Sequence, residues 1–313
     1  MTPFDLTTGS DTDWADVYRL HANHRTQAAP AESITTEADY RARLSHLPPS
    51  AHAAAWAHRA PTGDIVAFAW AVLHSARTVW VSDLIVAPEH RRQGHGRALF
   101  TLVKGYAESR GCRSVAGSVL TEPGRAFVTA LGGRESNRSR RSVWHPPLDP
   151  DLRRDLPAGY HLRSWIGATP DGLLDSFVRA RAAINDAPRD AAIDDEVWTP
   201  ERLREVEQAA ADRGNEVRVT AALTADGTVA GFTDLRVTGT QAMVDDTAVL
   251  PEHRNRGLAQ AVKYESLRLL VADHPAVTTV STSNDATNAA MIAVNTKLGF
   301  IETATWTHVL VTV

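Results

Sequence analysis

Two segments of this 313-residue chain place arginines, glycines and the start of a helix in the same order. Residues 83–96 read DLIVAPEHRRQGHG, and residues 246–259 read DTAVLPEHRNRGLA. Seven of the fourteen positions are identical without a gap. A match of this length indicates that each half of the chain carries one copy of the same structural unit.

Each segment has the composition of an anion-binding turn between a strand and a helix. Glycine lets a ligand approach the backbone closely. The N–H groups and the dipole of a helix N-terminus attract negative charge, and arginine adds charge-assisted hydrogen bonds to phosphate. The candidate ligand-binding residues are Arg91, Arg92, Gln93, Gly94, His95, Gly96 and Arg97 in the first turn and Arg254, Arg256, Gly257, Leu258 and Ala259 in the second. Such a turn suits a pyrophosphate, although a tight strand-to-helix connection has the same pattern.

Other phosphate and metal motifs are absent from the sequence. The chain has no G-x-x-x-x-G-K-[ST] segment, and Leu99 stands where a dinucleotide fingerprint needs its third glycine. The histidines form no H-E-x-x-H pattern, and a single cysteine, Cys112, excludes an internal disulfide and a multi-cysteine site. We therefore expect no metal site.

The segments around both turns predict the same order of strands and helices. Strand-like runs precede the turns at 53–60, 65–73 and 78–86 and again at 217–223, 229–237 and 242–249; helical stretches follow at 97–110 and 258–272. The segment HPPLDPDLRRDLPAG, residues 145–159, holds four prolines between the halves and suits a stiff linker. We expect a first domain at 1–148, a linker at 149–158 and a second domain at 159–313.

Both turns resemble the acetyl-CoA motif of the GCN5-related N-acetyltransferases (GNAT), R/Q-x-x-G-x-G/A after a strand. The matching residues are Arg91, Gly94 and Gly96 in the first half and Arg254, Gly257 and Ala259 in the second. The second half is similar to the tandem branch that includes mycothiol synthase, through Asn185-Asp186-Ala187-Pro188 and Asn288-x-x-Met291-x-x-x-Asn295-x-x-Leu298-Gly299-Phe300. The resemblance implies an α/β (α+β) fold of two tandem GNAT domains, each a mixed, mostly antiparallel twisted sheet flanked by helices.

The resemblance also implies an activity and a set of cofactor contacts. The expected enzyme is an N-acetyltransferase in which the amine of a small molecule attacks the thioester of acetyl-CoA directly. The family takes an oxyanion donor from strand backbone N–H groups, here near Val86 or near Ala248 and Val249. Asn288 fits the position that binds the pantetheine arm, unless it caps a helix. Asn295 and Val128 stand where many members have a tyrosine that acts as the general acid, so neither half has this tyrosine. Either water protonates the departing thiolate or the acid lies elsewhere, and Asn295 is a candidate cofactor contact.

Three aspartates are candidates for taking the proton of the amine. Asp83 and Asp246 occupy the same position in the two repeats, and Asp245 lies next to Asp246. Neighbouring strand residues face opposite sides, so one of Asp245 and Asp246 is expected to point into the cleft. A carboxylate there could act as the general base, bind an ammonium group, or support the sheet by hydrogen bonding.

We place the chemistry in the second half, because it keeps more of the family pattern. The first half would then bind acetyl-CoA weakly or act as a scaffold. The acid-rich loop at residues 186–196 could attract a cationic amine. Two alternatives stay open: a non-catalytic acyl-CoA-binding or scaffold protein, and an acyltransferase that uses a longer acyl donor or a protein amine.

The overall composition is that of an ordinary globular protein, with 43% apolar and 22% charged residues. A formal charge of −4 implies no large cationic surface, so we expect no nucleic acid partner. The longest apolar run, Ile65–Leu73, is too short to cross a bilayer, and the first residues show no secretory signal. We expect a cytoplasmic protein that is either a monomer with an internal pseudo-twofold axis or a homodimer.

Overall fold

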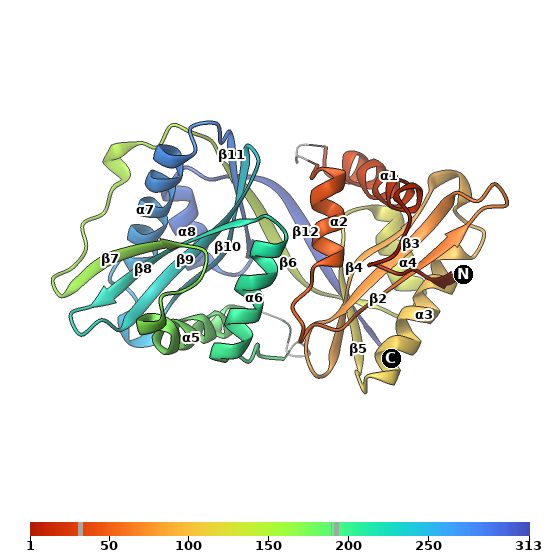
Figure 1. The fold of residues 1–313 in the computed structure, drawn as a ribbon, viewed down its shortest axis with the longest axis horizontal. Coiled ribbons are helices and arrows are strands. Elements are labelled where there is room, and N and C mark those ends of the chain that lie inside the picture. Colours follow the sequence, from red (N-terminus) through yellow and green to blue (C-terminus); the bar gives the residue numbers. More distant parts are fainter. Residues whose placement is uncertain (31–33, 189, 191–193) are drawn as a thin grey trace. The chain divides into compact units, whose positions relative to one another are not determined.

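The computed structural model describes residues 1–30, 34–188, 190 and 194–313. It contains two compact units that are not consecutive stretches of the chain (Figure 1). The first unit comprises Met1–Arg138, Asp190–Asp195 and Trp306–Val313. The second comprises Ser139–Arg189 and Glu196–Thr305. Each unit is described by itself below.

The first unit is a sheet with helices on both faces. Its strands are β1 (Thr2–Pro3), β2 (Ala53–Arg59), β3 (Ile65–Leu73), β4 (Thr78–Val86), β5 (Ser114–Val119) and the last part of β12 (Ile301–Thr312). They follow one another in this order across the sheet, with β4 and β5 parallel and the other neighbours antiparallel. The helices are α1 (Asp11–Ala28), α2 (Glu37–Ser45), α3 (His95–Ser109) and α4 (Glu122–Ala130).

The alternation of β3 explains why helices cover both faces of the first sheet. Phe68 and Trp70 pack with the apolar residues of α1 and α2, including Trp14 and Leu44. The alanines between them, at positions 67, 69 and 71, pack with Leu99 and its neighbours on α3. A strand buried on both faces reads as a continuous apolar run, which is the pattern that the sequence has at Ile65–Leu73.

The second unit repeats this plan. Its strands are β7 (Tyr160–Ile166), β8 (Glu216–Thr224), β9 (Val229–Thr238), β10 (Gln241–Val249), β11 (Thr279–Asp285) and most of β6 (Arg134–Trp144), in that order across the sheet. Its helices are α5 (Leu174–Ala182), α6 (Pro200–Asp212), α7 (Leu258–Asp273) and α8 (Ala289–Lys297). Phe177 of α5 and Leu203 of α6 pack on one face of this sheet, and Leu267 of α7 packs on the other. The predicted fold class, a mixed sheet with flanking helices in each half, is confirmed.

The second sheet has two irregularities along β10, the strand that carries Asp245 and Asp246. The parallel pairing of β10 with β11 covers only Gln241–Met243 and Thr279–Ser281, so the last residues of β10 have no ladder partner on β11. On its other side, the pairing of β10 with β9 shifts register between Val244 and Thr247. This bulge contains Asp245 and Asp246, two of the candidate acids, and re-aims their side chains.

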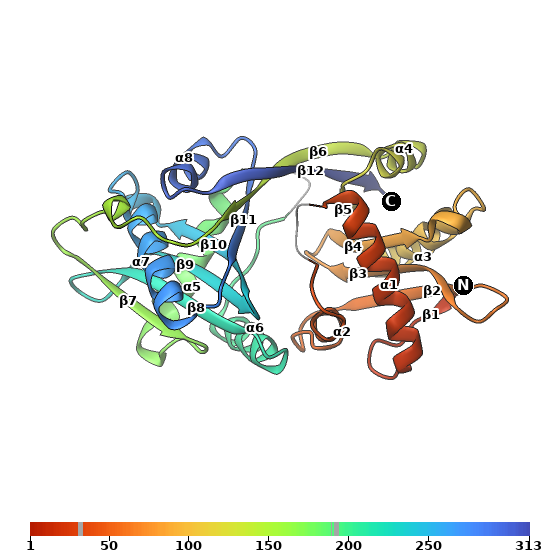
Figure 2. The same ribbon diagram turned by 90° about the horizontal axis from the view of Figure 1, so that it is seen from above.

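Two strands are shared between the units (Figure 2). Along the chain, β6 begins in the first unit and ends in the second, whereas β12 begins in the second and ends in the first, so the two halves of the chain exchange strands. Ser139–Trp144 of β6 pair with β11 in the second unit. Thr307–Thr312 of β12 pair with β5 in the first unit, where Val311 joins the core beneath α3. The final strand of the chain therefore completes the sheet of the N-terminal half. None of the helices in the described ranges is long and apolar enough to cross a membrane.

The exchange predicts that a change in the last strand destabilises the first unit. Val311→Ala removes buried apolar volume beside Leu99 and should lower the free energy of unfolding of that unit by about 1–3 kcal/mol. Hydrogen exchange of the β5 amides should accelerate accordingly. The neighbouring exposed substitution Thr312→Ala is the control and should leave both quantities unchanged. Faster exchange in β9 and β10 with β5 unaffected would contradict the assignment of the last strand.

Candidate functional site

The two predicted turns have the same backbone course in both units. β4 ends at Val86, a 3₁₀ turn follows at Pro88–His90, and Gly94 (φ 87°) is the N-cap of α3. β10 ends at Val249, a 3₁₀ turn follows at Pro251–His253, and Gly257 (φ 80°) is the N-cap of α7. Both glycines take the left-handed conformation that side chains disfavour, which explains why the repeat keeps glycine here.

Arginine holds each turn against the strand that precedes it. The Nε atom of Arg91 donates a 3.0 Å hydrogen bond to the carbonyl oxygen of Val86, and Arg254 makes the same bond, also 3.0 Å, to Val249. Gln93 and Arg256, at equivalent positions, donate to the carbonyl oxygens of Glu89 and Glu252. These hydrogen bonds tie each turn to the residues that precede it.

The backbone of both turns suits a phosphate-bearing ligand. Arg92 and Asn255 also have positive φ angles, of 62° and 59°, just before the glycines. Left-handed residues in a turn can direct successive backbone N–H groups towards one concave point, where an anion binds. Gly94 leaves open space at the position of a Cβ atom. The residues present therefore fit the pyrophosphate of acetyl-CoA.

The remaining predicted turn residues make contacts within the protein, some in the core and some at the surface. Gly96 lies against the ring of Phe127, where a Cβ atom would make an ordinary van der Waals contact at 3.4 Å. Leu258 is buried in the core, so only its backbone can face a ligand. His95 stacks on His58 with ring centroids 4.3 Å apart. Arg97 reaches the carbonyl oxygen of Ala130. Their role in binding acetyl-CoA stays a prediction.

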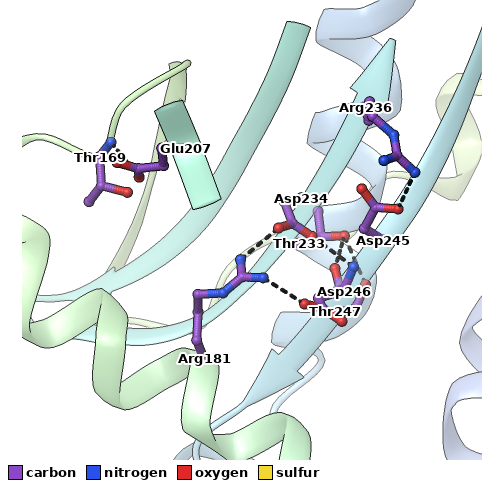
Figure 3. Close-up of polar contacts among 9 residues, drawn as sticks. All are labelled: Thr169, Arg181, Glu207, Thr233, Asp234, Arg236, Asp245, Asp246 and Thr247. Atoms are coloured by element: carbon purple, nitrogen blue, oxygen red, sulfur yellow. Dashed lines mark hydrogen bonds and ion pairs between the residues drawn. The ribbon is translucent and has the colours of Figure 1, made fainter. Parts of the chain in front are cut away.

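A triad of charged side chains joins α5, β9 and β10, the last of which leads into the second turn (Figure 3). The guanidinium of Arg181 on α5 donates from one nitrogen to Asp234 on β9 and from another to Asp246 on β10, each at 2.7 Å. Asp234 also accepts a 2.7 Å hydrogen bond from the backbone N–H of Asp246. Asp234 is 5% exposed, whereas the Asp246 carboxylate is partly open. One carboxylate is thus fixed as a support and the other is accessible.

The triad changes the acidity of Asp246. Burial, together with the negative charge of Asp234, raises the pKa of Asp246 to about 7, although the Arg181 guanidinium acts in the opposite direction. Burial also raises the pKa of Asp245 to about 6, against the opposing charge of Arg236, which Asp245 contacts at 3.0 Å. Both acids of the bulge are therefore stronger bases than an ordinary aspartate.

Aromatic rings surround the cation of the triad. The Arg181 guanidinium lies 4.4 Å from the ring centroid of Trp198 and 5.4 Å from that of Phe232. This contact desolvates the ion pairs and strengthens them. The sequence reasoning missed Arg181, Asp234 and Trp198. A signal was available for Asp234, because it is the acid in the otherwise apolar centre of the run 229–237.

Asp83, the equivalent of Asp246, is enclosed by partners in the first unit. Its carboxylate contacts Nδ1 of His21 at 3.1 Å, accepts a hydrogen bond from Tyr40 at 3.0 Å and lies 3.6 Å from Arg43. Burial alone would raise the pKa of Asp83, but the contacts with His21, Arg43 and Tyr40 outweigh it and lower the pKa to about 2. On the neighbouring strand, its register partner is Trp70. Asp83 is therefore a stable anion and a poor base.

The two asparagines of the second unit make contacts within the protein. Oδ1 of Asn288 accepts the Met291 backbone N–H at 3.1 Å and caps α8, as the structural alternative anticipated. Asn295 is buried and donates to Oδ1 of Asn284 at 2.5 Å. Their contact with acetyl-CoA stays a prediction.

Two carboxylates of the acid-rich loop form ion pairs with arginines, and the attraction of the loop for a cationic amine stays a prediction. Asp190 forms an ion pair with Arg134 at 2.8 Å, and Asp194 forms one with Arg77; all four residues belong to the first unit. These carboxylates neutralise arginines there. Residues 189 and 191–193 of the predicted loop lie outside the described residues.

Comparisons with known proteins identify the family. The model of the Acetyltransferase (GNAT) family matches the chain twice, over residues 14–131 and 181–300. A mycothiol acetyltransferase of Clavibacter michiganensis subsp. michiganensis (strain NCPPB 382) is 30% identical over 229 residues, which cover 71% of this chain and 69% of that protein. A mycothiol acetyltransferase of Clavibacter sepedonicus is 32% identical over 198 residues, covering 60% of this chain and 59% of the relative.

Solved structures give the same result for the complete architecture. A tandem GNAT protein from the clavulanic acid biosynthesis pathway has a TM-score of 0.82 at 25% identity, with 99% of this chain and 97% of that chain covered. A GCN5-related N-acetyltransferase from Sphaerobacter thermophilus has a TM-score of 0.74 at 17% identity, with the same coverages, and supports the fold alone. The chain belongs to the acetyltransferase (GNAT) family, as two domains in tandem, and it is an acetyltransferase.

The buried anion in the first unit yields a stability prediction. Asp83→Asn should lower the free energy of unfolding of the first unit by about 1–3 kcal/mol at pH 7, because the partners of Asp83 lose a charged acceptor. The folded-state pKa of Asp83 lies below its ordinary value, so its stabilisation is present above about pH 4 and disappears as the pH falls towards 2. Urea unfolding should therefore show a gap between wild type and variant that narrows from pH 5 to pH 2. A gap that does not depend on pH would contradict the prediction.

Proposed function

We propose that the chain transfers the acetyl group of acetyl-CoA to the amine of a small molecule, and that the second unit carries out this reaction. The observation that supports this most strongly is the triad of Asp234, Arg181 and Asp246, whose last member lies on the strand that leads into the second anion-binding turn. A carboxylate with a raised pKa can accept the proton that an attacking ammonium gives up. The acceptor of the mycothiol acetyltransferases named above is the first amine to test.

The reaction needs a base because amines are protonated near neutral pH. When bound, acetyl-CoA supplies an acetyl thioester, and transfer to the amine leaves an amide and the thiol of CoA. Asp246 accepts the proton that the attacking ammonium gives up, directly or through one water. Its raised pKa matches this task, because a base is most effective when its pKa lies near the working pH.

The other residues hold the base and the reactants in place. Arg181 and Asp234 fix the orientation of the Asp246 carboxylate, so little reorganisation is needed at the moment of transfer. Backbone N–H groups near Ala248 and Val249, at the end of β10, are assigned to the developing charge on the thioester oxygen. Asn295 cannot supply a proton, so we assign protonation of the departing thiolate to solvent.

The first unit is assigned a supporting role. Its candidate base, Asp83, has a lowered pKa and is 7% exposed. A carboxylate that stays ionised among three partners gains little by accepting a proton. The first turn nevertheless keeps the geometry of an anion site, so binding of acetyl-CoA without transfer is consistent with its residues.

Removing the base should abolish most of the activity. Asp246→Asn is expected to lower kcat about 10²- to 10⁴-fold, measured as acetyl-CoA consumption with a panel of amines. Asp245→Asn should cause a smaller loss, and Asp83→Asn should leave kcat within about twofold. Acetyl transfer at the wild-type rate by the Asp246→Asn variant would contradict the assignment, and no transfer by the wild type to any amine would contradict the proposed function.

The pH dependence of kcat tests whether the charge of Asp234 raises the pKa of Asp246. In the wild type, kcat should fall below about pH 7, because Asp246 then becomes protonated and cannot act as a base. Asp234→Asn removes a negative charge that raises the pKa of Asp246, so this limb should shift to lower pH. The exposed substitution Asp175→Asn on α5 makes the same charge change away from the triad and should not move the limb. Identical pH profiles for wild type and Asp234→Asn would show that Asp234 does not tune the base.

A further inference from the structure

The two anion-binding turns differ in what covers their glycine. At Gly94 of the first turn, a Cβ atom would meet nothing within 4 Å. At Gly257 of the second turn, a Cβ atom would overlap Nε of Arg154 and lie 2.7 Å from its Cδ and Cζ atoms. Arg154 comes from the proline-rich segment before β7, outside the repeat. The second turn therefore has a covering side chain that the first lacks.

The residues before and after Arg154 in the chain are both anchored to α7 or to the core next to it. Gln260 donates a 3.2 Å hydrogen bond to the carbonyl oxygen of Leu152, and Leu152 packs on the core beneath α7. On the other side of Arg154, Leu156 packs on the cluster that contains Leu258, the first residue of α7. These anchors fix the backbone near the turn and leave the guanidinium at its rim.

The placement of Arg154 is electrostatically unfavourable without an anion. A helix N-terminus carries partial positive charge, and Arg254 and Arg256 add two cations. Arg254 has a carboxylate partner, Asp186, whereas none of the acids in the described ranges forms an ion pair with Arg154. Cations gathered at one point repel one another, and a bound phosphate relieves that repulsion.

We propose that Arg154 is a phosphate ligand of the second acyl-CoA site and makes that site bind acyl-CoA more tightly than the first. The proposal rests on the proposed function, because it assumes that the second turn holds a CoA ester. Arg154 would close over the pyrophosphate from outside the repeat, while the turn N–H groups bind it from within. Its guanidinium can make two hydrogen bonds to one phosphate, which a lysine cannot reproduce.

Calorimetric titration with CoA tests this proposal in the full-length chain. Gly94→Glu is used as the background, because a side chain there blocks the first turn and leaves the second to be measured. Arg154→Ala should weaken CoA binding about tenfold, and Arg154→Lys should recover only part of it. The loss should shrink as NaCl is raised from 50 to 500 mM, since the contact is exposed and ionic.

Arg153→Ala is the matched control. It removes the same charge from the adjacent, exposed position of the same segment and should leave CoA binding unchanged. Equal affinities for the Arg154→Ala and Arg153→Ala variants would overturn the role of Arg154, and tighter binding by Arg154→Ala would show that this side chain blocks the turn. Failure of the Gly94→Glu protein to bind CoA, with its melting temperature unchanged, would overturn the second site and with it the proposed function.

Discussion

One guanidinium, that of Arg181, is shared between a buried carboxylate, Asp234, and a partly exposed one, Asp246, and the arrangement of the second unit depends on it. Asp234 and Asp246 lie on neighbouring strands and each contacts this cation at 2.7 Å, so without it their like charges would repel each other. Removing one partner from a buried group of charges typically costs about 3–5 kcal/mol. The bulge of β10 turns Asp246 towards α5, and the rings of Trp198 and Phe232 keep water from the cation. The bulge of β10, the position of α5 and the aromatic rings therefore all contribute to holding Arg181 between the two carboxylates.

The two halves show how the same scaffold gives opposite acidities. At the same repeat position, Asp83 meets His21, Tyr40 and Arg43, and its pKa falls. Asp246 shares a single arginine with a second aspartate, and its pKa rises. On the strand next to Asp83, the register partner of this acid is Trp70. On the strand next to Asp246, the carboxylate of Asp234 accepts a hydrogen bond from the Asp246 backbone N–H. A difference of a few neighbouring side chains therefore separates a structural anion from a candidate base.

The sequence predicted local features well and long-range ones poorly. The repeated turn and its glycines could be predicted because each depends on a few adjacent residues. The exchange of β6 and β12 could not, since strand partners far apart in the chain are selected by packing and not by the local pattern. Arg181 was missed for a related reason: it reaches Asp246 across 65 residues, from a helix whose pattern gives no sign of that contact. Asn288 was ambiguous because capping and ligand binding use the same side-chain oxygen.

The most direct test of the raised acidity is a titration of the aspartate carboxyl carbons by ¹³C NMR, with Asp246→Asn used to assign the signal. A carboxyl signal that titrates near pH 7 in the wild type and is missing from the variant is the predicted result. It would show that burial beside Asp234 prepares Asp246 to accept a proton at neutral pH. If the signal lost in the variant titrates below pH 5, Asp246 is an ordinary anion, and the placement of the base in the second unit is wrong.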